Sequence, residues 1–160
     1  MATSIEERIL DLLDAELSAI AVGAGDEVTV VTVTRASQEK PVMEFKPSEV
    51  PGVQIRHIDS KKDPLIRDAQ EVEMILELIC AVTPDATDEA LSDLMADVQD
   101  LVMSNERWDA GGGVFLARRS WISGSMKHEI EDPDAPQTGV VSCSILYRTE
   151  LANSFATKEI

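Results

Sequence analysis

Residues 90–114, ALSDLMADVQDLVMSNERWDAGGGV, decide the fold, because here an amphipathic pattern runs into a tryptophan and three glycines. Apolar residues recur at the spacing of one helical face, and polar residues, several of them aspartates, occupy the other. The pattern predicts a helix that covers one face of a sheet. Glycines 111–113 predict a tight reversal through positive φ angles. The predicted apolar face is Leu91, Leu94, Met95, Val98, Leu101 and Val102, and the predicted solvent side is Ser92, Asp93, Asp97, Gln99 and Asp100.

The clearest predicted strand precedes this helix, at residues 71–82. Val72, Met74, Leu76, Leu78, Cys80 and Val82 share one face, and Glu71, Glu73 and Glu77 mark the other, where Ile75 and Ile79 also lie. One face is therefore apolar throughout, whereas the second is polar at its start and apolar near its end. This pattern predicts a sheet covered by helices on one side and partly buried, for example by another subunit, on the other.

The rest of the chain predicts one domain spanning residues 1–160. Thr3 or Ser4 caps a helix whose apolar residues run from Ile5 to Ile20, and Gly23 and Gly25 end it. Further strands are predicted at 28–33, 53–58, 114–122 and 140–149. The segments predicted to be irregular are a proline-bearing loop at 36–52, a charged loop at 59–68, an acidic hairpin loop at 124–139 and a C-terminal arm at 150–160.

The composition is strongly acidic, with 14 basic against 30 acidic residues and a formal charge of −16. Because neutralising phosphates requires Lys and Arg, this balance argues against general DNA or RNA binding. It is compatible with a surface that faces DNA and repels it, and equally with an ordinary acidic cytosolic protein. The 44% of hydrophobic residues indicate a folded chain. Without a basic, apolar leader or a long apolar run, we expect a soluble intracellular protein with no membrane contact.

No metal or cofactor is predicted. His57, Asp59, Asp63 and Asp68 match no standard ligand spacing, and His128 with Glu129, Glu131, Asp132 and Asp134 form at most a weak cation site at a loop tip. Cys80 and Cys143 lie in apolar runs outside any zinc-type spacing, so we expect buried thiols in a reducing compartment.

No enzyme is predicted either. Glu71, Glu73 and Glu77 lie along one strand, whereas acid–base chemistry requires two carboxyls that converge across a cleft. The glycine run lacks the Lys and Ser/Thr of a phosphate-binding loop and leads into a strand. Ser120, Ser123 and Ser125 lack the G-x-S-x-G context of a hydrolase.

Protein–protein contact is the remaining kind of site. Tyr and Arg are favoured at interface hot spots, and a Tyr–Arg pair here ends a strand just before a terminal arm. The glutamates on the half-polar strand face are interpreted as a solvated or interface-facing stripe. The candidate interface residues are Glu71, Glu73, Glu77, Trp108, Tyr147, Arg148 and Phe155.

The order of segments resembles a known family. ERILDLLDAEL is followed by PGVQIRHID, EVEMILELICAV, LSDLMADVQDLVMSNERWDAGGGV and finally ILYRTELANSFA. Nearly the whole chain thus resembles the tail terminator proteins, minor tail proteins of long-tailed bacteriophages and prophages. The helix leading to Trp and glycines, and the closing YRT…N-x-F passage, carry most of the likeness.

The resemblance implies an α+β fold, with a mainly antiparallel sheet of about five strands and two main helices packed on one face. It implies a non-enzymatic virion protein, made in the bacterial cytoplasm, that forms a hexameric ring on the head-proximal end of the tail tube. The ring would stop tube elongation and join the neck connector, with tail tube and sheath proteins as further partners. DNA would pass through without specific binding, and the charge predicts an acidic lumen and a monomeric free protein.

Three alternatives remain open at the level of sequence. The first is a neck or head-completion connector protein, which shares the small α+β fold and ring assembly. The second is a small acidic cellular enzyme or ligand-binding protein, for which convergent Glu71, Glu73 or His57 in a deep polar pocket would be evidence. A generic acidic interaction module has only the net charge in its favour.

Overall fold

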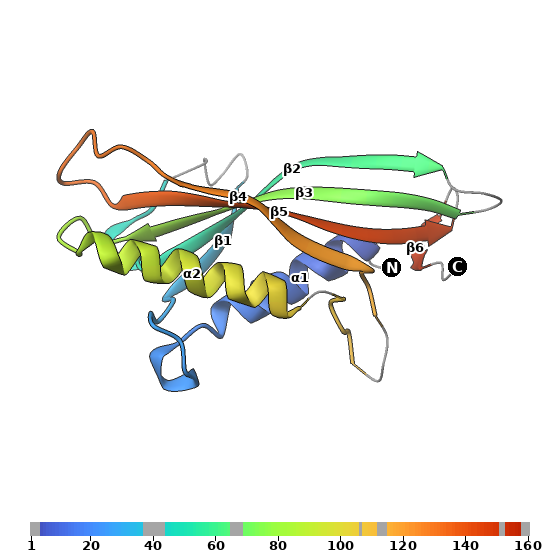
Figure 1. The fold of residues 1–160 in the computed structure, drawn as a ribbon, viewed down its shortest axis with the longest axis horizontal. Coiled ribbons are helices and arrows are strands. Elements are labelled where there is room, and N and C mark those ends of the chain that lie inside the picture. The colour runs from blue at the N-terminus through green and yellow to red at the C-terminus, as the bar shows by residue number, and fades with distance from the viewer. Residues whose placement is uncertain are drawn as a thin grey trace.

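The computed structural model describes residues 4–36, 44–64, 69–105, 107–111, 115–150 and 153–157; for residues 150 and 153–157 it describes the backbone alone. Two α-helices pack on one side of a long, twisted sheet (Figure 1). The described strands are β1 (Thr32–Arg35), β2 (Gly52–Pro64), β3 (Ala69–Val82), β4 (Arg119–Lys127), β5 (Gln137–Glu150) and β6 (Asn153–Thr157). This arrangement confirms the predicted α+β fold class.

Both helices begin at a side-chain cap, and the cap of the first helix at Ser4 was predicted. Ser4 accepts a hydrogen bond from the Glu7 backbone N–H at the start of α1 (Ile5–Ser18). Thr87 does the same for Ala90 at the start of α2 (Asp88–Ser104). Each cap satisfies a backbone N–H that has no partner within the helix. Short 3-10 turns follow α1 (η1, Val22–Ala24) and precede β2 (η2, Pro47–Glu49).

The strand order is β1-β2-β3-β5-β4, with β6 pairing the end of β5 beyond β4. β1 and β2 are parallel and every other described pair is antiparallel. The long β3–β5 ladder brings two apolar alternations onto the face beneath the helices, where all eight residues are buried. Its core pairs are Val72 with Tyr147, Met74 with Ile145, Leu76 with Cys143 and Leu78 with Val141.

Strand lengths differ from the prediction in two hairpins. β2 continues to Pro64, so the described part of the predicted 59–68 loop is strand, and residues 65–68 lie outside the described range. A bulge between His57 and Asp59 shifts the register and breaks the alternation that marks a strand. A second bulge, between Ile122 and Gly124, hides the continuation of β4 to Lys127. The predicted loop at 124–139 is therefore a loop only between β4 and β5, at 128–136.

Other strands and loops also differ from the prediction. β1 begins at Thr32, later than the predicted 28–33 strand. β4 begins at Arg119, later than the predicted 114–122 strand. Before it, Asp109 and Phe115 form an isolated antiparallel bridge. The arm predicted to be irregular contains β6, whose backbone pairs with β5. Of the 36–52 loop, residues 37–43 lie outside the described range.

The helix predicted within 90–114 is confirmed as α2, with one exception on its predicted solvent side. Gly112 and Gly113 of the predicted turn lie outside the described residues. Leu91, Leu94, Met95, Val98 and Val102 are buried, and Gly111 has a φ of +99°. Asp97, predicted on the solvent side, is only 9% exposed, because its carboxylate accepts the backbone N–H groups of Glu27 and Val28 at 3.0 and 3.1 Å. Desolvation raises the pKa of Asp97, and these two hydrogen bonds oppose that shift.

No helix in the described part of the chain is long and apolar enough to cross a membrane.

Candidate functional site

The glutamates of β3 lie on the sheet face away from the helices, as predicted, and each has its own partner on a neighbouring strand. Glu71 accepts a hydrogen bond from Arg148 Nε at 3.1 Å, and Glu77 pairs with Arg56 at 3.5 Å. Glu73 accepts from Ser144 Oγ at 3.2 Å. The three carboxylates are therefore engaged separately along the strand, and they form a row of polar pairs with no common focus.

This face changes character along β3. Beside the glutamates, Ile75 and Leu146 are half-buried, and Arg119 stacks over the half-buried Trp121 at 5.1 Å. Towards the other end of β3, Ile79 and Gln54 are buried within the chain. We call the partly exposed half, around Glu71, Ile75, Glu77, Leu146 and Trp121, the open face. The prediction of a face that is polar at its start and apolar near its end is confirmed.

A second polar cluster joins α1 to β2 and β5. Glu6 Oε2 accepts hydrogen bonds from Ser60 Oγ at 2.7 Å and from the Tyr147 hydroxyl at 3.2 Å. His57 Nδ1 lies 3.5 Å from Glu6 Oε1, and its Nε2 lies 2.8 Å from Ser60 Oγ. Serine, histidine and glutamate thus meet in an arrangement that superficially matches a hydrolase triad.

The hydrogen-bond directions in this cluster do not activate Ser60. The Ser60 hydroxyl donates its proton to Glu6, and His57 Nε2 also lies 3.1 Å from the Asp59 carbonyl, which can only accept. In the tautomer that donates from Nε2 to this carbonyl, Nε2 is not a base towards Ser60. The cluster ties the start of α1 to the sheet, and we assign it a structural role.

The candidate interface residues divide on burial. Trp108 is 2% exposed, and its Nε1 donates to Ser120 Oγ at 2.7 Å. Tyr147 is 4% exposed; burial, and then the charge and hydrogen bond of Glu6, raise its pKa. Both rings are therefore part of the hydrophobic core of the chain, and their role at an interface stays a prediction. Arg148 remains on the open face with the glutamates, and the side chain of Phe155 lies outside the described structure.

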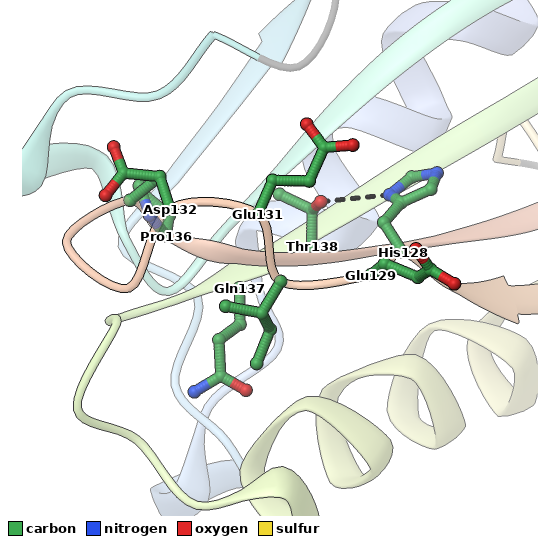
Figure 2. A pocket seen from close by; sticks show the side chains of 9 residues that line it. His128, Glu129, Glu131, Asp132, Pro136, Gln137 and Thr138 are labelled. Atoms are coloured by element: carbon green, nitrogen blue, oxygen red, sulfur yellow. Dashed lines mark hydrogen bonds between the residues drawn. The ribbon is translucent and has the colours of Figure 1, made fainter.

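The hairpin loop at 128–136 lines an open pocket of about 430 Å³ (Figure 2). His128 Nδ1 lies 2.9 Å from Thr138 Oγ1, which closes the base of the loop. The carboxylates of Glu129, Glu131 and Asp132 point in separate directions (Figure 2). Across the described residues, no group of three His, Cys, Asp or Glu side chains is placed to hold a metal ion. Cys80 and Cys143 are buried, and burial raises the pKa of each thiol to about 12.

The structure also reveals a cationic surface that the sequence reading missed. Arg107, Arg118 and Arg119 are exposed where the chain enters β4, and Arg107 stacks over the 43%-exposed ring of Phe115 at 4.7 Å. A backbone hydrogen bond from Ala117 to Arg107 brings the two parts of this surface together. The adjacent arginines at 118 and 119 are the signal in the sequence that could have indicated this surface.

No protein-family model matches the chain, and no curated protein matches it. Among solved structures, it is similar to a chain described as "Virion of native gene transfer agent (GTA) particle". The two share 14% sequence identity with a TM-score of 0.46, and the match covers 84% of this chain and 90% of that chain.

Proposed function

We propose that the protein is a structural component of a phage-like virion, and that it forms a hexameric terminator ring at the head-proximal end of the tail tube. Its sequence pattern resembles that family, and the observation that carries the proposal is the open face. One side of the sheet is sealed by helices, whereas the other leaves half-buried Ile75, Leu146 and Trp121 among paired charges. Apolar residues within a polar surround are typical of a protein–protein contact.

The chemistry of this face favours assembly over catalysis. Its carboxylates are held by Arg56, Arg148 and Ser144, so they lend orientation and specificity to a contact. In the proposed role the protein is not an enzyme. Its partners are further copies of itself, the tail tube protein, the neck connector and, in a contractile tail, the sheath. Each copy adds a formal charge of −16, which would repel DNA from the ring wall.

Negative-stain microscopy of the protein mixed with isolated tail tubes tests the proposal. We expect six-fold rings at one end of each tube, and an Ile75→Arg variant that folds but forms no ring. Met103→Arg, on the exposed side of α2, is the matched control and should still form rings. Binding to DNA-filled heads in place of tubes would overturn the terminator role and favour a neck or head-completion protein.

A further inference from the structure

Two surfaces at opposite ends of β4 carry opposite charge. The first, which we call the acidic tip, is the hairpin loop with Glu129, Ile130, Glu131, Asp132 and Asp134, all exposed. The second, which we call the arginine patch, consists of Arg107, Phe115, Arg118 and Arg119. β4 runs from the patch to the tip, and its nine residues span about 30 Å (Figure 1).

The two surfaces also match in their apolar content. Ile130 is 65% exposed between two glutamates, and Phe115 is 43% exposed beneath Arg107. An exposed apolar group ringed by one charge is complementary to an exposed apolar group ringed by the other, since packing and ion pairing then form together. No described carboxylate forms an ion pair with any of the three patch arginines, although acidic residues outnumber basic ones by 30 to 14.

Contacts within the chain hold both surfaces in place. At the base of the tip, Gln137 Nε2 donates to the Ala86 carbonyl at 2.7 Å, and Lys127 pairs with Asp88 at 2.9 Å. In the patch, the Arg118 backbone N–H donates to the Leu146 carbonyl at 2.8 Å. Ordering the backbone in advance reduces the entropy lost on binding.

We infer that the acidic tip of one copy docks on the arginine patch of the next copy. Because the two surfaces differ and lie at opposite ends of the molecule, the contact is heterologous and runs head to tail. A heterologous contact generates a closed ring when its rotation closes. The inference rests on the proposed ring for what the copies build, and it adds a second contact between copies to the one proposed for the open face.

Paired charge reversal tests the contact without any tail component. The tip variant is Glu129→Lys with Glu131→Lys and Asp134→Lys, and the patch variant is Arg107→Glu with Arg118→Glu. The three acidic side chains chosen are exposed, and none of them forms a hydrogen bond or ion pair within the described structure. Sedimentation of concentrated protein should show self-association of the native chain, weakened about tenfold or more in each variant alone. An equimolar mixture of the two variants should restore it, because every tip then finds a patch of opposite sign.

A matched control separates this contact from the effect of net charge. Glu16→Lys with Asp63→Lys and Asp100→Lys makes the chain less negative by the same amount as the tip variant, at exposed positions outside both surfaces. It should associate at least as well as the native chain, because general repulsion falls. Three outcomes would overturn the inference. Both variants could still associate, the mixture could stay dissociated, or the native chain could be monomeric at millimolar concentration.

Tail binding, measured separately, distinguishes the two proposals. If the native chain caps tubes and both variants also cap them, the terminator role stands and the contact is wrong. If the native chain self-associates through reversible charges but ignores tubes, the contact stands and the terminator role is wrong.

Discussion

The two faces of β3 differ in how their side chains are held: one is buried under the helices, and the other is partly exposed. On the helix-covered face of β3, every second residue from Val72 to Val82 is buried against α1, α2 or the neighbouring core. On the open face, Glu71, Glu73 and Glu77 form cross-strand pairs with Arg148, Ser144 and Arg56. Burial stabilises the helix-covered face, whereas these partly exposed pairs contribute little to folding, and the open face is available for contact.

The largest expected effect is the loss of an apolar side chain from the covered face. Leu76 is fully buried, so Leu76→Ala should lower the free energy of unfolding by about 2–5 kcal/mol. Ile75→Ala, one residue away on the half-buried open face, should cost clearly less. Urea denaturation monitored by circular dichroism measures both. Equal losses at the two positions would show that the open face is as well packed as the core.

A smaller effect is expected at Asp97, the charged exception on the covered side. Asp97→Ala removes the acceptor for the Glu27 and Val28 N–H groups and should cost about 1–3 kcal/mol. Asp97→Asn keeps an acceptor oxygen and removes a desolvated charge that Asp26 and Glu27 repel, so it should cost less than the alanine variant. The same urea measurement decides, and an asparagine variant as unstable as the alanine variant would contradict this account.

Asp97 should also leave a trace in the pH dependence of stability. Its pKa is raised above the ordinary value of 3.8, so the folded state holds this proton more tightly than the unfolded state. Its contribution to stability is therefore greatest at acid pH and falls as pH rises from 3.8 through the raised value. Relative to Asp97→Asn, the native chain should lose stability across that window. A difference between the two chains that stays constant with pH would refute the shift.

The smallest effect is expected for an ion pair on the open face. Glu71 and Arg148 are partly solvated, so a double-mutant cycle with Glu71→Gln and Arg148→Met should give a coupling of about 0.2–1 kcal/mol. Thermal unfolding at low and high salt measures the coupling and its screening. A coupling of several kcal/mol would mean that this face is structural after all, and would weaken its assignment to assembly.

Local pattern predicted much of this fold because burial repeats with the period of the element. The alternation at 71–82 and at 140–149 predicted both the strands and their covered face, and the spacing from Leu91 to Val102 predicted α2. The cap at Ser4 was predictable for the same reason, since its side chain accepts a hydrogen bond from a residue three positions along the chain.

Bulges and distant contacts escaped prediction. The register shift after His57 is a property of the β2–β3 pair, so the alternation read from β2 alone ended too early. The burial of Trp108 depends on Ser120 and the chain reversal between them, and that of Tyr147 depends on Glu6 at the other end of the chain. Local sequence pattern therefore could not show that Trp108 and Tyr147 are buried in the core.

The alternating and helical patterns and the start of α1 could be predicted from the sequence, because each depends on residues within a few positions of one another. The acidic balance follows from the composition alone. Only the tertiary structure decided which charges are paired, that Asp97 is buried, and that the acidic tip and the arginine patch lie at opposite ends of β4. These features depend on residues far apart in the chain, and their energies arise only when folding brings the groups together.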